Sequence, residues 1–105
     1  NRELWYQVCL DGKGKLRTCR RIGKGTVSAS PVHVRQVVEN ALYAGASTII
    51  LAHNHPSGVA LPSESDRAVT LWVRDALKTM DIRLLDHIIV ADNDFVSMNQ
   101  SGYLL

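Results

Sequence analysis

The stretch that decides the fold is Ser47-Thr-Ile-Ile-Leu-Ala-His-Asn-His55. Its β-branched and apolar residues form the short continuous run that is typical of a buried strand. Alternate residues of a strand point to the same side, so His53 and His55 are expected to face one side of the sheet. Pro56-Ser-Gly58 then ends the strand. The sequence therefore predicts two imidazoles presented together where a strand ends.

A helix is predicted directly after this strand, over residues 64–80. Its apolar residues recur at the i, i+3, i+4, i+7, i+8, i+11 spacing of one helix face: Val69, Trp72, Val73, Ala76, Leu77 and Met80. Asp66 lies three residues before Val69, so it extends the buried face of the helix. A buried carboxylate needs a partner, and the two histidines, through a metal ion, would supply one.

The combination His53-x-His55-x(10)-Asp66 predicts a metal site. Two imidazoles and one carboxylate suit a zinc ion that keeps a fourth position open for water, as in zinc hydrolases. The alternative is that Ser63-x-x-Asp66 is only a capping box, with Asp66 favourable near the positive end of the helix dipole. All three residues fall where a strand end and a helix start converge, which is where α/β folds place their sites. We therefore favour the metal site.

The rest of the chain reads as alternating strands and helices. Strands are predicted over 3–10, 15–22, 47–53, 82–91 and 94–98, and a first helix over 31–44, opened by Ser30 and Pro31 as N-cap and N1. This order indicates an α/β domain in layers with a mixed sheet. The 105 residues, 46% of them hydrophobic, predict a single domain over residues 1–105.

The motif is close enough to a known one to be compared with it. His53-Asn-His-Pro-Ser-Gly58, followed by Pro62-Ser63 and Asp66, resembles the JAMM motif, in which H-x-H-P precedes S-x-x-D and a glutamate lies far upstream. This form is similar to the RadC-like branch of the JAB/MPN superfamily. The similarity also includes the stretches 3–11, 25–26, 32–35 and 85–90.

The resemblance implies both a fold and an activity. The fold is a three-layer αβα sandwich with a mixed β-sheet, of cytidine-deaminase-like architecture. The activity is that of a zinc metallopeptidase or isopeptidase with one Zn²⁺ per chain, acting on a peptide or isopeptide substrate. A zinc nucleobase deaminase fits poorly, because H-x-E and P-C-x-x-C are absent from the sequence.

Two glutamates are candidates for the upstream position of the motif. Glu39 lies off the apolar face of the first helix, one turn after Arg35, so we expect it to be solvated and ion-paired. Glu3 opens the first strand, where the family pattern also has its glutamate, although an ordinary polar residue near a chain end is the alternative. We choose Glu3. The assigned roles are then zinc ligands for His53, His55 and Asp66, proton shuttle for Glu3, and oxyanion hydrogen bonding for Ser63.

Three further residues receive predictions. Asn54 alternates with the two histidines, so we expect a structural role on the opposite side of the strand. His33 is expected at the surface of the first turn of a helix. For His87, the default interpretation is a buried histidine held by a backbone group, and the alternative is a group that orients a metal ligand.

Charge is uneven along the chain, although the net charge is only +2. Six cations follow one another around a predicted hairpin without an intervening acid: Lys13, Lys15, Arg17, Arg20, Arg21 and Lys24. They indicate either a solvated hairpin, whose lysines discourage aggregation, or a patch that binds nucleic acid or an acidic partner. Two alternatives to the hydrolase thus stay open: a non-catalytic MPN-like interaction module, and a DNA-associated factor that matches the family's DNA-repair label.

The cysteine count and the lack of a visible secretory signal predict reduced thiols. Cys9 and Cys19 lie on the two arms of the hairpin and could face one another, but two cysteines make no disulfide framework and reduced thiols are expected. No segment has membrane-spanning length and no secretory signal is visible, so we expect a cytoplasmic protein without membrane contact. The sequence begins at Asn1 rather than Met, which suits a domain excised from a longer protein. The sequence does not determine the oligomeric state.

Overall fold

The computed structural model describes residues 2–25 and 32–105. Its elements are β1 (Glu3–Leu10), β2 (Leu16–Gly25), α1 (Val34–Ala44), β3 (Thr48–Asn54), α2 (Glu64–Lys78), β4 (Arg83–Ala91) and β5 (Asp94–Ser97). Every predicted strand and helix is therefore present. The predicted helix start at Ser30 and Pro31 lies outside the described residues, and exposed His33 takes the N-cap position of α1. Neither helix in the described part of the chain is long and apolar enough to cross a bilayer.

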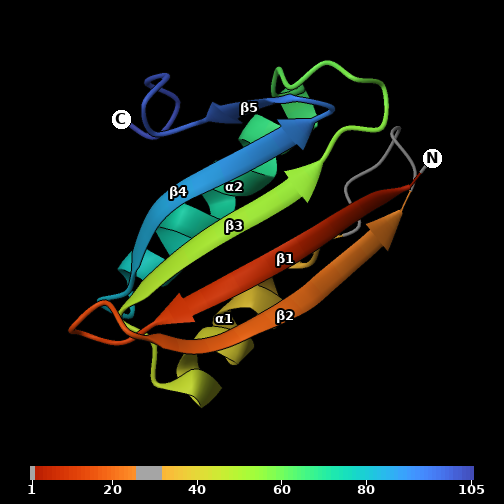
Figure 1. Cartoon of the computed structure of the whole chain (residues 1–105). Coiled ribbons are helices and arrows are strands. Elements are labelled where there is room, and N and C mark those ends of the chain that lie inside the picture. Colours follow the sequence, from red (N-terminus) through yellow and green to blue (C-terminus); the bar gives the residue numbers. More distant parts are fainter. Residues whose placement is uncertain (1, 26–31) are drawn as a thin grey trace.

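The five strands form one mixed sheet in the order β2-β1-β3-β4-β5 (Figure 1). β3 and β4 are parallel, and the other three neighbouring pairs are antiparallel. A parallel pair needs a crossover connection, and α2 provides it between β3 and β4. This connection brings the start of α2 back to the carboxyl end of β3, where the two motif histidines lie.

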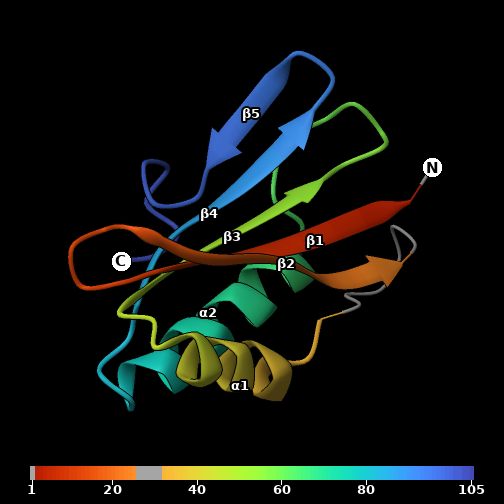
Figure 2. The same ribbon diagram turned by 60° about the horizontal axis from the view of Figure 1, so that its bottom comes forward.

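Both helices cover the same face of the sheet (Figure 2). α1 packs against α2, while α2 also packs against β4 and α1 against β1 and β2. The predicted α/β class and mixed sheet are confirmed, and the arrangement is consistent with the JAB/MPN-like fold. The layers differ from the expected sandwich in one respect. Because the two helices contact each other, the described residues supply a single helical layer, and the other sheet face carries no helix from them.

The core lies between the sheet and the two helices. Strand residues alternate in burial, and the side chains that face the helices include Trp5, Cys9, Ile49 and Leu51. They pack in one cluster with Val37, Ala41, Val73 and Leu77 from the helices. A smaller cluster under β4 and β5 contains Ala60, Ile89, Ala91 and Met98, and Tyr103 and Leu104 pack against it. The side chains of Tyr103 and Leu104 thus return to the core of the domain.

The buried face of α2 is rotated from the predicted one. Its buried residues are Asp66, Val69, Thr70, Val73 and Leu77. Trp72 and Met80 were expected to be buried, but they are 65% and 48% exposed. Met80 lies beyond the end of the helix, and Trp72 lies at the border of the face, beside the start of α1. The rotation places Thr70, a polar residue, inside the core.

Candidate metal centre

The predicted site residues converge where the carboxyl end of β3 meets the starts of β1 and α2. β1 runs antiparallel to β3 with Trp5 opposite His53, and continuing this register places Glu3 beside His55. Asp66 lies in the first turn of α2 and is buried, as its helical spacing predicts. Residues that are far apart in the sequence thus supply one cluster.

The distances within this cluster are close to those expected between the ligands of one metal ion. The Nε2 atoms of His53 and His55 are 3.0 Å apart. Asp66 Oδ2 lies 3.0 Å from His55 Nε2 and 3.4 Å from His53 Nε2. Ligand atoms bound about 2.1 Å from a tetrahedral zinc ion lie about 3.4 Å from one another. The three atoms therefore have nearly the spacing of one face of such a coordination sphere.

A second carboxylate, Glu3, flanks the same histidine pair. One ligand atom from each of Glu3, His53 and His55 can be chosen so that all lie within 4.8 Å of one another. Glu3 Oε2 is nevertheless 3.9 Å from His55 Nε2, whereas Asp66 Oδ2 is closer to both imidazoles. The individual distances favour Asp66 as the ligand and leave Glu3 one step farther out.

Hydrogen bonding fixes which nitrogen of His55 carries its proton. His55 Nδ1 is 2.8 Å from the carbonyl oxygen of Val59. A carbonyl only accepts, so Nδ1 donates, and in the neutral ring Nε2 keeps its lone pair. This lone pair faces the carboxylate of Asp66. Burial would raise the pKa of Asp66, but the neighbouring His53 and the hydrogen bond from the Ser63 backbone N–H outweigh it and hold the pKa well below its ordinary value.

The capping-box interpretation of Asp66 is confirmed, and it is compatible with the predicted metal site. Ser63 caps α2, since its Oγ accepts from the Asp66 backbone N–H at 3.0 Å. Asp66 Oδ2 accepts in return from the Ser63 backbone N–H at 2.9 Å, which completes the capping box. The same oxygen approaches the histidines. The capping box therefore fixes the carboxylate in the orientation that a metal site needs, and it leaves the exposed Ser63 hydroxyl with a proton to donate.

Trp5 is a site residue that the sequence prediction missed. Its indole N–H donates to Glu3 Oε1 at 3.2 Å. Its ring stacks on the imidazole of His53, with 3.9 Å between centroids and 3° between planes. The signal was available, because Trp5 follows Glu3 at the alternation that puts both on one face of β1. Glu39, the rejected candidate, lies exposed on α1 and pairs with Arg35 at 3.6 Å, as predicted.

His87 has partners other than the predicted backbone group. Its Nε2 is 2.7 Å from His53 Nδ1, and its Nδ1 is 2.7 Å from Thr70 Oγ1. The predicted burial of His87 is confirmed, but the predicted backbone partner is wrong, because the ring contacts a proposed metal ligand directly. Burial, and then the charge of His53, lower the pKa of His87 to about 3. Thr70 was missed because its polar side chain interrupts an apolar helix face.

Asn54 forms hydrogen bonds to the start of β1, where Glu3 lies. Its Oδ1 accepts from the backbone N–H of Leu4 at 2.6 Å, and its Nδ2 donates to the carbonyl of Arg2 at 3.0 Å. These two bonds flank Glu3 in the sequence. The predicted structural role of Asn54 is confirmed. Because its two partners lie on either side of Glu3 in the sequence, Asn54 also holds the backbone of Glu3 in place.

Removing this clamp is expected to destabilise the protein. Asn54→Ala leaves the partly buried Leu4 N–H without its acceptor, which should lower the free energy of unfolding by about 1–3 kcal/mol. Asn54→Asp keeps an acceptor for Leu4 and loses only the bond to Arg2, so its loss should be smaller. Urea denaturation, together with hydrogen exchange of the Leu4 amide, measures both effects. Wild-type values in Asn54→Ala would show that the clamp is unimportant.

The basic hairpin does not form a single patch. Lys13, Lys15, Arg17, Arg20, Arg21 and Lys24 are all exposed. Arg21 pairs with Tyr6 and Arg20 with Gln7, so their side chains point to opposite faces of the sheet. Nucleic-acid binding by this hairpin stays a prediction.

The two cysteines do not face one another, since Cys9 pairs with Thr18 and Cys19 with Val8, and both are free thiols.

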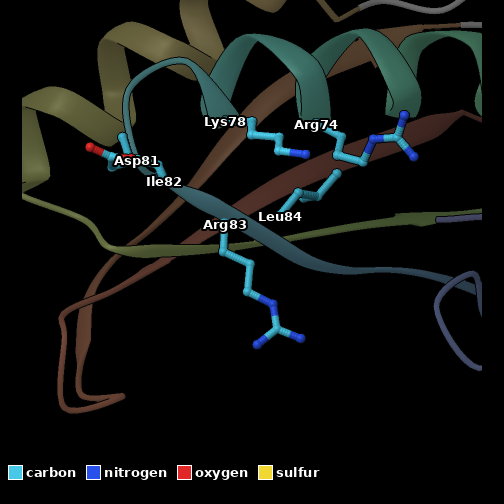
Figure 3. Close-up of a pocket in the computed structure, with 6 residues that line it drawn as sticks. All are labelled: Arg74, Lys78, Asp81, Ile82, Arg83 and Leu84. Atoms are coloured by element: carbon cyan, nitrogen blue, oxygen red, sulfur yellow. The ribbon is translucent and has the colours of Figure 1, made fainter. Parts of the chain in front are cut away.

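A pocket at the other end of β3 and β4 is separate from the cluster. It lies between the end of α2 and the start of β4, and Figure 3 shows the side chains of Arg74 and Lys78 extending over Leu84 while Arg83 points to the other side of the strand. The Arg74 guanidinium already donates to Asp75 and to carbonyls of the C-terminal residues. The charged side chains of this pocket thus do not converge, and the histidine cluster is the stronger candidate for a functional site.

Comparison with known proteins identifies the family. A family model described as RadC-like JAB domain matches residues 1–103. A UPF0758 protein of Vibrio vulnificus (strain YJ016) is 43% identical over 104 residues, which cover 99% of this chain and 46% of that protein. A UPF0758 protein of Vibrio cholerae (strain M66-2) is 44% identical over 103 residues, 98% of this chain and 46% of its own. The chain spans about half the length of these curated relatives, and since the family model matches nearly all of it, the chain belongs to the RadC-like JAB domain family.

Proposed function

We propose that this domain is a zinc-dependent hydrolase of the peptidase or isopeptidase type. The observation that carries the proposal is the convergence of two imidazole nitrogens and one carboxylate oxygen within 3.0–3.4 Å of each other. At least one of these nitrogens, in His55, points its lone pair into the cluster. Electron-rich atoms that face each other at this distance need a cation between them.

The donor set suits zinc better than calcium or magnesium. Calcium and magnesium prefer all-oxygen sites, whereas two imidazoles with one carboxylate are frequent ligands of catalytic zinc. His53, His55 and Asp66 would hold the ion. Zinc bound by three protein ligands supplies a water molecule of lowered pKa and polarises a substrate carbonyl.

The remaining chemistry belongs to the residues around the ligands. Glu3 is buried, and its Oε1 is occupied by the Trp5 indole, so Oε2 is the oxygen available to take a proton from water and pass it to the leaving amine. The Ser63 hydroxyl, anchored by the helix cap, would donate to the developing oxyanion. Together these roles describe hydrolysis of an amide bond.

Metal analysis tests whether the histidine cluster binds zinc. We expect about one zinc ion per chain in the wild type and almost none in a variant with His53→Ala and His55→Ala, since two of three ligands are lost. His33→Ala is the matched control, because His33 is exposed at the N-cap of α1. Elemental analysis after purification without chelator gives the ratio. Equal zinc in the double variant and the wild type would contradict the site.

Substrate profiling tests the reaction class. The loop 56–62 separates the histidines from Asp66 and exposes two apolar side chains, Val59 and Leu61. We expect the zinc-loaded protein to hydrolyse members of a peptide or isopeptide library, with an extended peptide as substrate. Zinc-dependent hydrolysis of nucleic acid alone would reject the peptidase assignment. Zinc binding without turnover on any library would favour a non-catalytic interaction module.

A further inference from the structure

His87 connects two of the proposed zinc ligands through hydrogen bonds that the proposed function does not use. It lies on β4 with its side chain toward the helices, and it is fully buried. One ring nitrogen contacts His53 and the other contacts Thr70, each at 2.7 Å. Thr70 in turn lies 2.5 Å from the backbone carbonyl of Asp66. The chain of contacts begins at one ligand, Asp66, and ends at another, His53.

The direction of each hydrogen bond follows from the Asp66 end. A carbonyl oxygen only accepts, so the Thr70 hydroxyl donates its single proton to Asp66. The alternative acceptor, the sulfur of Met98, is weak and lies 3.8 Å away. Thr70 Oγ1 must then accept from His87, which places the His87 proton on Nδ1.

The tautomer of His87 determines the tautomer of His53. With its proton on Nδ1, the neutral His87 ring presents the lone pair of Nε2 to His53 Nδ1. His53 must therefore donate from Nδ1, and its own Nε2 is left without a proton. That atom is the one 3.0 Å from His55 Nε2 and 3.4 Å from Asp66 Oδ2. Both histidines then present an Nε2 lone pair to the cluster. In His55 this follows from the hydrogen bond of Nδ1 to Val59, and in His53 from the hydrogen bond of Nδ1 to His87.

We propose that Thr70 and His87 form a positioning relay that holds His53 in the tautomer and orientation needed to bind zinc. The proposal rests on the proposed zinc site and assigns a role to two residues that do not bind the ion. The relay starts on the backbone of Asp66, so one set of hydrogen bonds aligns ligands from α2 and β3. The stacked Trp5 ring holds the imidazole of His53 in its plane, but only the relay determines where its proton sits.

Removing one hydroxyl should disturb the relay with little change of shape. Thr70→Val leaves His87 Nδ1 without an acceptor, so the proton of His87 is expected to move to Nε2. His53 Nδ1 must then accept, and its proton moves to the nitrogen that should bind zinc. Loss of such an outer partner typically lowers metal affinity by about 10–100-fold. Thr70→Ser keeps the hydroxyl and should bind zinc with nearly wild-type affinity.

The experiment has two readouts. The first is the Zn²⁺ affinity of the wild type, Thr70→Val, Thr70→Ser and Met98→Leu, measured by competition with a chromogenic chelator. Met98→Leu is the packing control, since Met98 is a buried neighbour of Thr70 that leaves the relay intact. The second is long-range ¹H–¹⁵N correlation NMR of the wild type without metal, which reports the tautomer of each histidine ring.

The expected result is an Nδ1–H tautomer of His87, with affinity reduced in Thr70→Val alone. An Nε2–H tautomer of His87 in the wild type would overturn the relay, and so would wild-type zinc affinity in folded Thr70→Val. An equal loss of affinity in Met98→Leu would also overturn it, since core packing would then explain the effect. Should the wild type bind no zinc, the proposed function fails, yet the NMR spectrum still decides the tautomer of His87.

Discussion

Replacing Glu3 by glutamine is expected to lower the rate of peptide hydrolysis by about 10²–10⁴-fold, the usual contribution of a general acid–base. The amide has nearly the same shape and can still accept the indole N–H of Trp5, so the fold should be unchanged. It cannot take a proton from water at neutral pH. Because Glu3 lies farther from the histidine pair than Asp66 does, the variant should keep its zinc. Turnover of a substrate from the library and zinc content are measured together.

Glu39→Gln is the matched control for this prediction. The Glu39 carboxylate is exposed on α1 and pairs only with Arg35, itself exposed, so turnover should stay near that of the wild type. An inactive Glu39→Gln beside an active Glu3→Gln would show that we chose the wrong glutamate. Loss of zinc from Glu3→Gln would show that Glu3 is a ligand of the ion and not a proton shuttle.

The parts of the site that could be predicted are those set by local periodicity. Strand alternation alone places His53 and His55 on one side and Asn54 on the other, and their hydrogen bonds agree. Helical spacing alone places Asp66 on the buried face of α2. These rules relate residues close in sequence to a single face, and that is enough to bring three polar groups to one end of the sheet.

The parts that could not be predicted depend on packing between distant elements. Which face of the sheet α1 covers is decided by its contact with α2, and no sequence period encodes that contact. The partners of His87 come from α2 and β3, so the sequence could show only that a buried histidine needs a partner. The hairpin register, which separates Cys9 from Cys19, is shifted by an irregularity in pairing near Leu10.

Acidification is expected to destabilise the metal-free protein, and His87 should be a principal cause. Burial and the nearby charge of His53 lower the pKa of His87 from 6.5 to about 3. Between these two pH values the unfolded chain binds a proton at His87 that the folded protein does not bind, so the free energy of unfolding falls as the pH falls. One such group contributes a slope of up to about 1.4 kcal/mol per pH unit. Domains of this size are stable by only about 5–15 kcal/mol, so the effect is large.

Urea denaturation at a series of pH values between 7 and 3 measures this slope, and His87→Gln should reduce it. His33→Gln is the control, because His33 is exposed on α1 and should leave the slope unchanged. Asp66 makes the free energy of unfolding depend on pH in a lower pH range than His87 does. Its pKa is depressed below the ordinary 3.8, so its contribution is present above that value and is lost as the pH falls through the folded-state pKa. Asp66→Asn should therefore change the slope of the stability curve only below about pH 4. Equal slopes for the wild type and His87→Gln between pH 6.5 and 4 would mean that the buried ring of His87 takes up its proton without unfolding the protein.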